Sequence, residues 1–270
     1  MHCYLLRLTL AGLLLAVLAP AAMAQEAKSG LSSWFAGDWY LKVGGAGFVA
    51  PKFEGDDSYE FAFSPIISLG KAGTEARFTS RNDAISLGLF DNGSFRAGLA
   101  GDLVLPRDSE DADGLKDVDF GFEAGGFAEF YPTDWLRVRG EVMHGFIAHD
   151  GVVANVAVDA FTDITPEVRL SGGPRLSFAS AQYFEAYYGV NAAESVATGL
   201  GEYSPGGGVR SYGVGGAIDW KTTDRLTTSL FAEYERLGPP ATDSSVVKQS
   251  GSPNQYLIGI SATYRFDFSL

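Results

Sequence analysis

Residues 256–268 limit the possible folds of this chain more than any other stretch. Every second residue there is apolar or aromatic, whereas the residues between them turn polar toward the end of the stretch. This period of two, held for thirteen residues, predicts a β-strand with one apolar face. Strands of soluble proteins average about five or six residues, whereas strands that cross an outer membrane need about 9–11 and carry aromatic side chains at the lipid interfaces. The stretch therefore predicts a transmembrane strand.

Alternating segments of the same kind recur from Asp38 onward, separated by turn sequences. About twelve segments can be delimited, and residues 74–80 have the poorest alternation. The short connections are G-K-A-G, D-N-G-S, Y-P-T-D, T-D-I-T-P and K-T-T-D, and the long ones start near Pro51, Pro106, Ala179 and Gly238. The sequence thus predicts an all-β fold, a closed antiparallel transmembrane β-barrel of about 12 strands with short periplasmic turns and long external loops. A soluble secreted β-sandwich is the alternative.

The first residues have the pattern of a secretory signal peptide. Arg7 precedes an apolar run over residues 8–18, and Ala22 and Ala24 provide the small residues of a cleavage site after Ala24. A single-pass anchor is the alternative, but the run is shorter than the ~20 residues that a spanning helix needs. We therefore predict a signal peptide over residues 1–24, a periplasmic lead over 25–37 and the barrel over 38–270.

Composition narrows the set of partners and chemistries. The formal charge of −13 argues against nucleic acid as a partner, because nucleic acid requires a basic surface. The only cysteine, Cys3, lies in the predicted signal peptide, so the mature chain is expected to have neither disulfides nor thiolate ligands. No window after the signal peptide is apolar enough for a membrane helix. We expect the partners to be the lipid and lipopolysaccharide of the outer membrane of a Gram-negative bacterium.

Charged residues on the polar faces of the strands are the candidates for the barrel lumen. Lumen side chains are polar, and opposite charges on neighbouring strands are expected to pair. The lumen-facing candidates are Glu123, Glu129, Arg137, Arg139, Glu141, Asp159, Glu167, Arg169, Arg175, Glu233 and Arg265. Eight strands leave an interior filled by side chains and about sixteen leave an aqueous channel. About twelve strands are intermediate, so an open lumen and a plugged lumen both stay as alternatives.

The sequence gives little support for a catalytic or metal-binding role of the other polar residues. His144 shares the parity of lipid-facing residues and His149 lies in the H-D-G turn, and no nucleophile pattern accompanies either. The acidic loop with Asp108, Glu110, Asp111, Asp113 and Asp117 lacks the glycine and the closing glutamate of a calcium loop. We therefore expect no enzymatic activity, no cofactor and no metal site.

Residues 183–208, Y-F-E-A-Y-Y-G-V-N-A-A-E-S-V-A-T-G-L-G-E-Y-S-P-G-G-G, resemble a progression found in the MltA-interacting protein (MipA/OmpV) family. The W-K-T-T-D-R-L turn, the D-S-S-V-V segment where the family often shows S-P-I-V, the terminal Y-R-F and the N-terminal G-G-A-G-F-V-A-P-K-F-E-G-D-D follow the order of that family. The resemblance covers nearly the whole mature chain. It implies an outer-membrane barrel.

Two functional hypotheses follow. For its best-known member, the family implies a scaffold that links a murein lytic transglycosylase to a penicillin-binding protein in peptidoglycan synthesis. Such a scaffold would act through the lead and through the turns around Tyr131, Asp134 and Lys221. The alternative is a narrow pore or a small-ligand-binding barrel that uses the lumen charges and the long loops.

Overall fold

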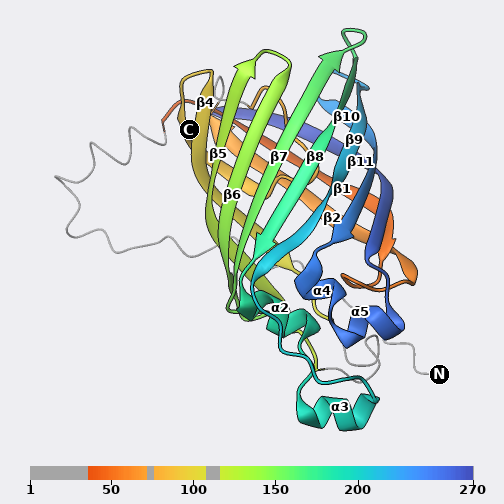
Figure 1. Cartoon of the computed structure of the whole chain (residues 1–270). Coiled ribbons are helices and arrows are strands. Elements are labelled where there is room, and N and C mark those ends of the chain that lie inside the picture. The colour runs from red at the N-terminus through yellow and green to blue at the C-terminus, as the bar shows by residue number, and fades with distance from the viewer. Residues whose placement is uncertain (1–35, 72–75, 108–115, 270) are drawn as a thin grey trace, which may run out of the picture. The chain divides into compact units, whose positions relative to one another are not determined.

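The computed structural model describes residues 36–71, 76–107 and 116–269, and residues 38–268 form one compact unit. The predicted signal peptide lies outside the described residues, as does nearly all of the predicted lead. The unit is a single antiparallel sheet with the order β2-β1-β11-β10-β9-β8-β7-β6-β5-β4-β3, curled into a nearly closed barrel (Figure 1). Its strands are β1 (Asp38–Pro51), β2 (Tyr59–Lys71), β3 (Ile85–Asp91), β4 (Phe95–Val104), β5 (Gly121–Thr133), β6 (Leu136–Phe146), β7 (Val152–Asp163), β8 (Val168–Ala179), β9 (Gly208–Lys221), β10 (Leu226–Leu237) and β11 (Asn254–Ser269).

The wall has its apolar side chains outside and its charged side chains inside. In β11, Ile258 is 57% and Ile260 is 64% exposed, and Phe61 on β2 is 73% exposed. By contrast, Arg137 and Asp159 are fully buried within the barrel. In soluble proteins arginine and aspartate are mostly exposed, and large contiguous apolar surfaces rarely are. This reversed arrangement matches a wall whose outer face is solvated by hydrocarbon.

The predicted count of about twelve strands is not confirmed, since the described residues contain eleven. The predicted strand at residues 74–80 is wrong over residues 76–80, which form no strand, and residues 74 and 75 lie outside the described residues. We call residues 76–84 the inward segment, because they contact side chains of the inner wall. With no strand in this place, β2 and β3 both run toward the short turns. The edges of the sheet therefore meet as parallel neighbours, and no backbone ladder joins them in the part of the chain that the structure describes.

The connections differ in length between the two ends of the barrel. The turns after β3, β5, β7 and β9 are short and lie at one end, which we call the short-turn end. The long connections lie at the other end, the long-loop end, and contain the helices α2 (Ala181–Tyr188), α3 (Ala192–Thr198), α4 (Pro239–Thr242) and α5 (Ser245–Ser250) (Figure 1). None of the helices in the described residues has both the length and the apolar character needed to cross a membrane.

A small apolar core holds the loops together at the long-loop end. Phe184 and Tyr188 of α2 are fully buried and pack with Leu237, Ala241 and Val247 from the region of α4 and α5. The sequence analysis assigned these residues to loops, except Leu237, which is the last residue of β10. Their helical turns arise because each short helix buries one apolar side against the others.

Candidate functional site

A charge-balanced cluster covers one side of the inner wall. Four arginines and four carboxylates contribute to it: Arg96, Arg137, Arg139, Arg175, Asp83, Glu129, Glu141 and Asp159. Arg137 donates from Nη2 to Asp159 at 2.6 Å, and Arg139 donates from Nε to Glu141 at 2.6 Å and also pairs with Glu129. Each of these charges is buried, so each needs a partner of opposite sign. We call this set the ionic cluster.

Asp83 attaches the inward segment to the ionic cluster. Its two carboxylate oxygens accept from Arg137 Nη1 and Nη2 at 2.7 and 2.8 Å. A bidentate arginine–carboxylate pair of this kind is among the stronger polar contacts in proteins. Asp83 also lies 3.6 Å from Arg139 Nε, so it pairs with two arginines of the wall. The inward segment thus supplies a carboxylate that two buried arginines share.

Further contacts hold the inward segment against the inner wall. Phe78 stacks on Phe161 of β7 with ring centres 4.9 Å apart. Arg169 Nη1 donates to the carbonyl oxygen of Arg77 at 2.8 Å, and the backbone N–H of Ala84 donates to Glu141 Oε1 at 3.2 Å. The segment is therefore held near its beginning and at its end by the strands of one side.

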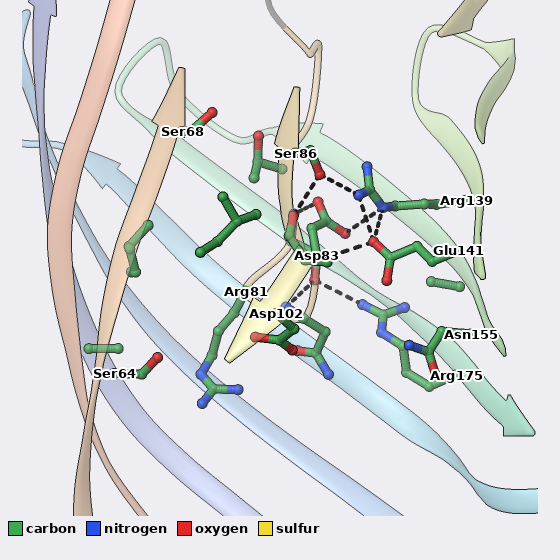
Figure 2. A pocket seen from close by; sticks show the side chains of 18 of the residues that line it. Ser64, Ser68, Arg81, Asp83, Ser86, Asp102, Arg139, Glu141, Asn155 and Arg175 are labelled. Carbon is green, nitrogen blue, oxygen red and sulfur yellow. Dashed lines mark hydrogen bonds and ion pairs between the residues drawn. The ribbon is translucent and has the colours of Figure 1, made fainter. Parts of the chain in front are cut away.

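Two polar cavities lie along the inward segment. The loop-side cavity, of about 540 Å³, reaches toward the long-loop end and is lined by Asp102, Arg210 and Glu235 among others (Figure 2). The turn-side cavity, of about 470 Å³, reaches toward the short-turn end, with Asp163 and Lys221 in its lining. Both are also lined by residues 79–82 of the inward segment, by Arg175 and by Glu233. These shared residues mark the boundary between the cavities.

At this boundary the inward segment reaches the opposite wall. The Arg81 guanidinium lies over the rings of Phe48 on β1 and Phe231 on β10, 4.5 and 4.8 Å from their centres. The next residue, Asn82, donates its side-chain amide to the carboxyl group of Glu233 on β10. Among the described residues Arg81 makes no ion pair, and its buried Nε has no hydrogen-bond partner. Arg81 is therefore a cation whose charge no carboxylate contact occupies.

The lumen residues predicted from the sequence lie at several different places inside the barrel. Glu129, Arg137, Arg139, Glu141, Asp159 and Arg175 belong to the ionic cluster. Glu233 lies at the boundary between the cavities, and Glu167, Arg169 and Arg265 line the turn-side cavity, with Glu167 in the β7–β8 turn. Glu123 lies apart from the others and contacts His149.

The sequence analysis missed Arg81, Asn82 and Asp83. No role was predicted for the tripeptide R-N-D, which leads into the next strand. The available signal was a charged tripeptide directly after the segment with the poorest alternation. Its role depends on Arg137, which is 54 residues away in the sequence, and no local pattern carries that information.

A second polar site closes the loops over the barrel. Glu54, between β1 and β2, pairs with Arg210 and accepts hydrogen bonds from the Tyr183 and Tyr188 hydroxyls at 2.9 and 2.8 Å. Burial alone would raise the pKa of Glu54, but Arg210 and the two hydroxyls hold this pKa below its ordinary value. The ionised carboxylate therefore fastens α2 across the long-loop end.

Neither histidine has the surroundings of a catalytic base. His149 was predicted in a turn, and the structure buries its ring, where Nε2 lies 3.0 Å from Glu123 and Nδ1 accepts from the backbone N–H of Gly151. His144 is partly exposed, with Nε2 3.5 Å from Asp150. Within the described residues no serine hydroxyl bonds to either ring, and no three metal-ligating side chains come together. Residues 108–113 of the acidic loop lie outside the described residues.

Comparison with known proteins places the chain among outer-membrane proteins. The profile of the family described as MltA-interacting protein MipA matches residues 43–266. The outer membrane protein Omp26La of Vibrio anguillarum is 26% identical over 247 residues, which cover 85% of this chain and 87% of that protein.

Solved barrels resemble the chain only distantly. LpxR from Salmonella typhimurium is 10% identical with a TM-score of 0.40, over 84% of this chain and 99% of that chain. OprG from Pseudomonas aeruginosa is 10% identical with a TM-score of 0.27, over 86% of this chain and 96% of that chain. The family match, with the reversed polarity of the wall, assigns the chain to the outer membrane: it belongs to the MltA-interacting protein MipA family.

Proposed function

We propose that the barrel is a narrow pore for small polar solutes, with a constriction formed by Arg81, Asn82 and Glu233. The observation that carries the proposal is the pair of polar cavities that share these three residues. A solute that crosses the barrel leaves one cavity and enters the other past this boundary. The short turns face the periplasm and the long loops face outward, as in other bacterial barrels. Lipid and lipopolysaccharide surround the wall, and the proposal includes no catalytic step, cofactor or metal.

The charges at the constriction indicate which solutes pass best. Arg81 makes no ion pair, so its charge is available to an anionic group of a passing solute. Glu233 lies beside it and is bonded to a neutral amide rather than to a cation. A cation and a carboxyl group side by side in a narrow passage orient dipolar molecules. Small anions and zwitterions therefore fit the passage better than cations.

Single-channel recordings in planar bilayers test the pore directly. Arg81→Ala removes the side chain between Phe48 and Phe231, so conductance should increase and the preference for anions should fall. Arg77→Ala is the matched control, because Arg77 belongs to the same inward segment but pairs with Asp134 away from the constriction. A silent wild-type bilayer, or equal conductance in the wild type and in Arg81→Ala, contradicts the proposal.

Substitutions in the ionic cluster are a poor test of the selectivity of the pore. Arg137 and Arg139 are among the predicted lumen-facing residues. Both are now seen to be buried and paired within the wall. Their replacement would leave carboxylates without partners and disturb folding before it changed selectivity.

A scaffold in peptidoglycan synthesis is the second candidate, and the description of the matching family favours it. It would link a lytic transglycosylase to a penicillin-binding protein through the short-turn end. The difficulty is area, since a specific interface needs about 800 Å² per partner and short turns offer little surface. Capture of a lytic transglycosylase from detergent extracts, lost when Asp134 and Lys221 are both replaced by alanine, supports this candidate. If these replacements leave the capture unchanged, the short turns are not the surface that binds the transglycosylase.

A further inference from the structure

The wall has one place where hydrogen-bonded strands do not close it. The edges of the sheet are β2 and β3, and among the described residues no ladder joins them. β3 begins at Ile85, which pairs with Gly101, so the part of β4 beyond Gly101 has no partner on that side. β2 is 13 residues long and β3 only seven, so β3 is too short to cover the whole of β2. We call this region the seam.

The loop-side cavity lies against both sides of the seam. Its lining includes six consecutive residues of β2, Phe63 to Ser68. On the other side it includes Ile85, Leu103 and Leu105 from the region of β3 and β4. The same cavity is lined inside by part of the ionic cluster, including Asp83, Arg139 and Glu141, and by Arg81 (Figure 2). The loop-side cavity therefore connects the polar interior of the barrel to the seam between β2 and β3.

The outer rim of the seam is apolar. Phe63 is 64% exposed, Ile67 is 44%, Leu103 is 48% and Leu105 is 65%. A backbone N–H or C=O group that faces hydrocarbon without a hydrogen-bond partner is strongly destabilising. An open sheet edge in a membrane therefore needs a polar group nearby or fewer backbone N–H donors. Pro65 has no N–H to leave unpaired, and proline in sheets is confined to edge strands and bulges. The composition of β2 thus fits an edge that stays unpaired.

We propose that the seam is a lateral opening through which a single-chain anionic amphiphile binds, with its tail in the bilayer and its head group in the loop-side cavity. The apolar rim suits the tail. The guanidinium of Arg81, which makes no ion pair, and the hydroxyl of Ser64 suit a carboxylate or phosphate head. The proposal shares Arg81 with the pore, but binding at the seam does not require conduction.

Reversible bridging of the seam tests this directly. The mature chain is predicted to have no cysteine, so Ile67→Cys with Ile85→Cys provides two unique thiols on the outer face across the seam. A bifunctional methanethiosulfonate joins them, and a reductant releases them. The control is Leu230→Cys with Ile260→Cys, which are exposed partners on the hydrogen-bonded strands β10 and β11.

The probe is dansyl-labelled undecanoic acid, added to liposomes that contain the protein. We expect saturable binding to the wild type, about a tenfold weaker affinity when the seam is bridged, and recovery on reduction. The bridged control pair should bind as the wild type does. Arg81→Gln should weaken binding of the carboxylate probe but not of its neutral amide analogue.

Three outcomes overturn the proposal: no saturable binding to the wild type, unchanged binding with the seam bridged, or thiol bridges that form only between two chains. Bridges that form only between two chains would show that the seam is a contact between two copies of this protein. Conductance recorded from the same preparation separates the two proposals. Conduction with no amphiphile binding overturns the lateral opening alone, and amphiphile binding in a silent bilayer overturns the pore alone.

Discussion

Single charged residues determine how the interior of this barrel is arranged. Asp83 comes from outside the strands and adds a carboxylate to the ionic cluster, where it pairs with Arg137 and Arg139. This places one residue of an irregular segment at the centre of the packing. Arg81 and Asn82 reach the opposite wall because Asp83 fixes the chain beside them.

Replacement of Asp83 should therefore be costly. Asp83→Ala removes the bidentate partner of Arg137 and one of the carboxylates that pair with Arg139, and loss of one partner of a buried ion pair typically costs about 3–5 kcal/mol. Urea unfolding from liposomes, followed by tryptophan fluorescence, measures the free energy of unfolding. Asp134→Ala is the control, because Asp134 is fully exposed and its replacement should leave the midpoint unchanged. Equal urea midpoints for the two variants would show that Asp83 does not stabilise the ionic cluster.

The loop closure at Glu54 should depend on pH. The pKa of Glu54 is lowered in the folded protein, so its contribution to stability is fully present above the unfolded pKa and is lost as pH falls through the folded pKa. α2 should thus stay docked near neutral pH and loosen below about pH 4.

Hydrogen exchange of residues 181–188, corrected for the intrinsic effect of pH, measures this docking. Glu54→Gln should show weak protection at both neutral and acidic pH. Glu60→Gln, at an exposed position on β2, should behave as the wild type. Constant protection of the wild type across the acidic range would contradict the role of the carboxylate.

At the scale of the elements, the strands follow from local patterns and the exceptions follow from distant contacts. The period of two in β11 and the turn sequences between strands were sufficient to predict the all-β fold. The inward segment was not predictable in the same way, because ion pairs with β6 and a ring stack with β7 hold it. The helices were missed because their apolar sides become evident only where the loops pack on each other.

The outward face of β11 gives a direct test of its environment. Ile258→Arg places a charge on the lipid side, where such a change costs about 2–4 kcal/mol near the middle of the bilayer. Ser261→Arg is the control on the same strand, because Ser261 lines the turn-side cavity. Folding yield into liposomes should fall for the first variant and stay close to the wild type for the second. Equal yields would contradict the assigned faces of the strand.

At the scale of the whole molecule, an odd number of described strands and a divided lumen have the same origin. Residues 76–84 lie inside the barrel and form no strand. This leaves β2 and β3 as unpaired parallel edges, and it separates the interior into two cavities. One segment therefore accounts for the constriction, for the seam and for the difference from the predicted strand count.

The most direct test of this account is the current through a channel with a single thiol at Asn82→Cys. Asn82 lies between the two cavities, so its modification by a small anionic methanethiosulfonate should reduce the single-channel current, and a reductant should restore it. Ile258→Cys, on the outer face, should conduct as before under the same treatment. A full current after complete modification at position 82 would show that solutes do not pass the inward segment and would contradict the account.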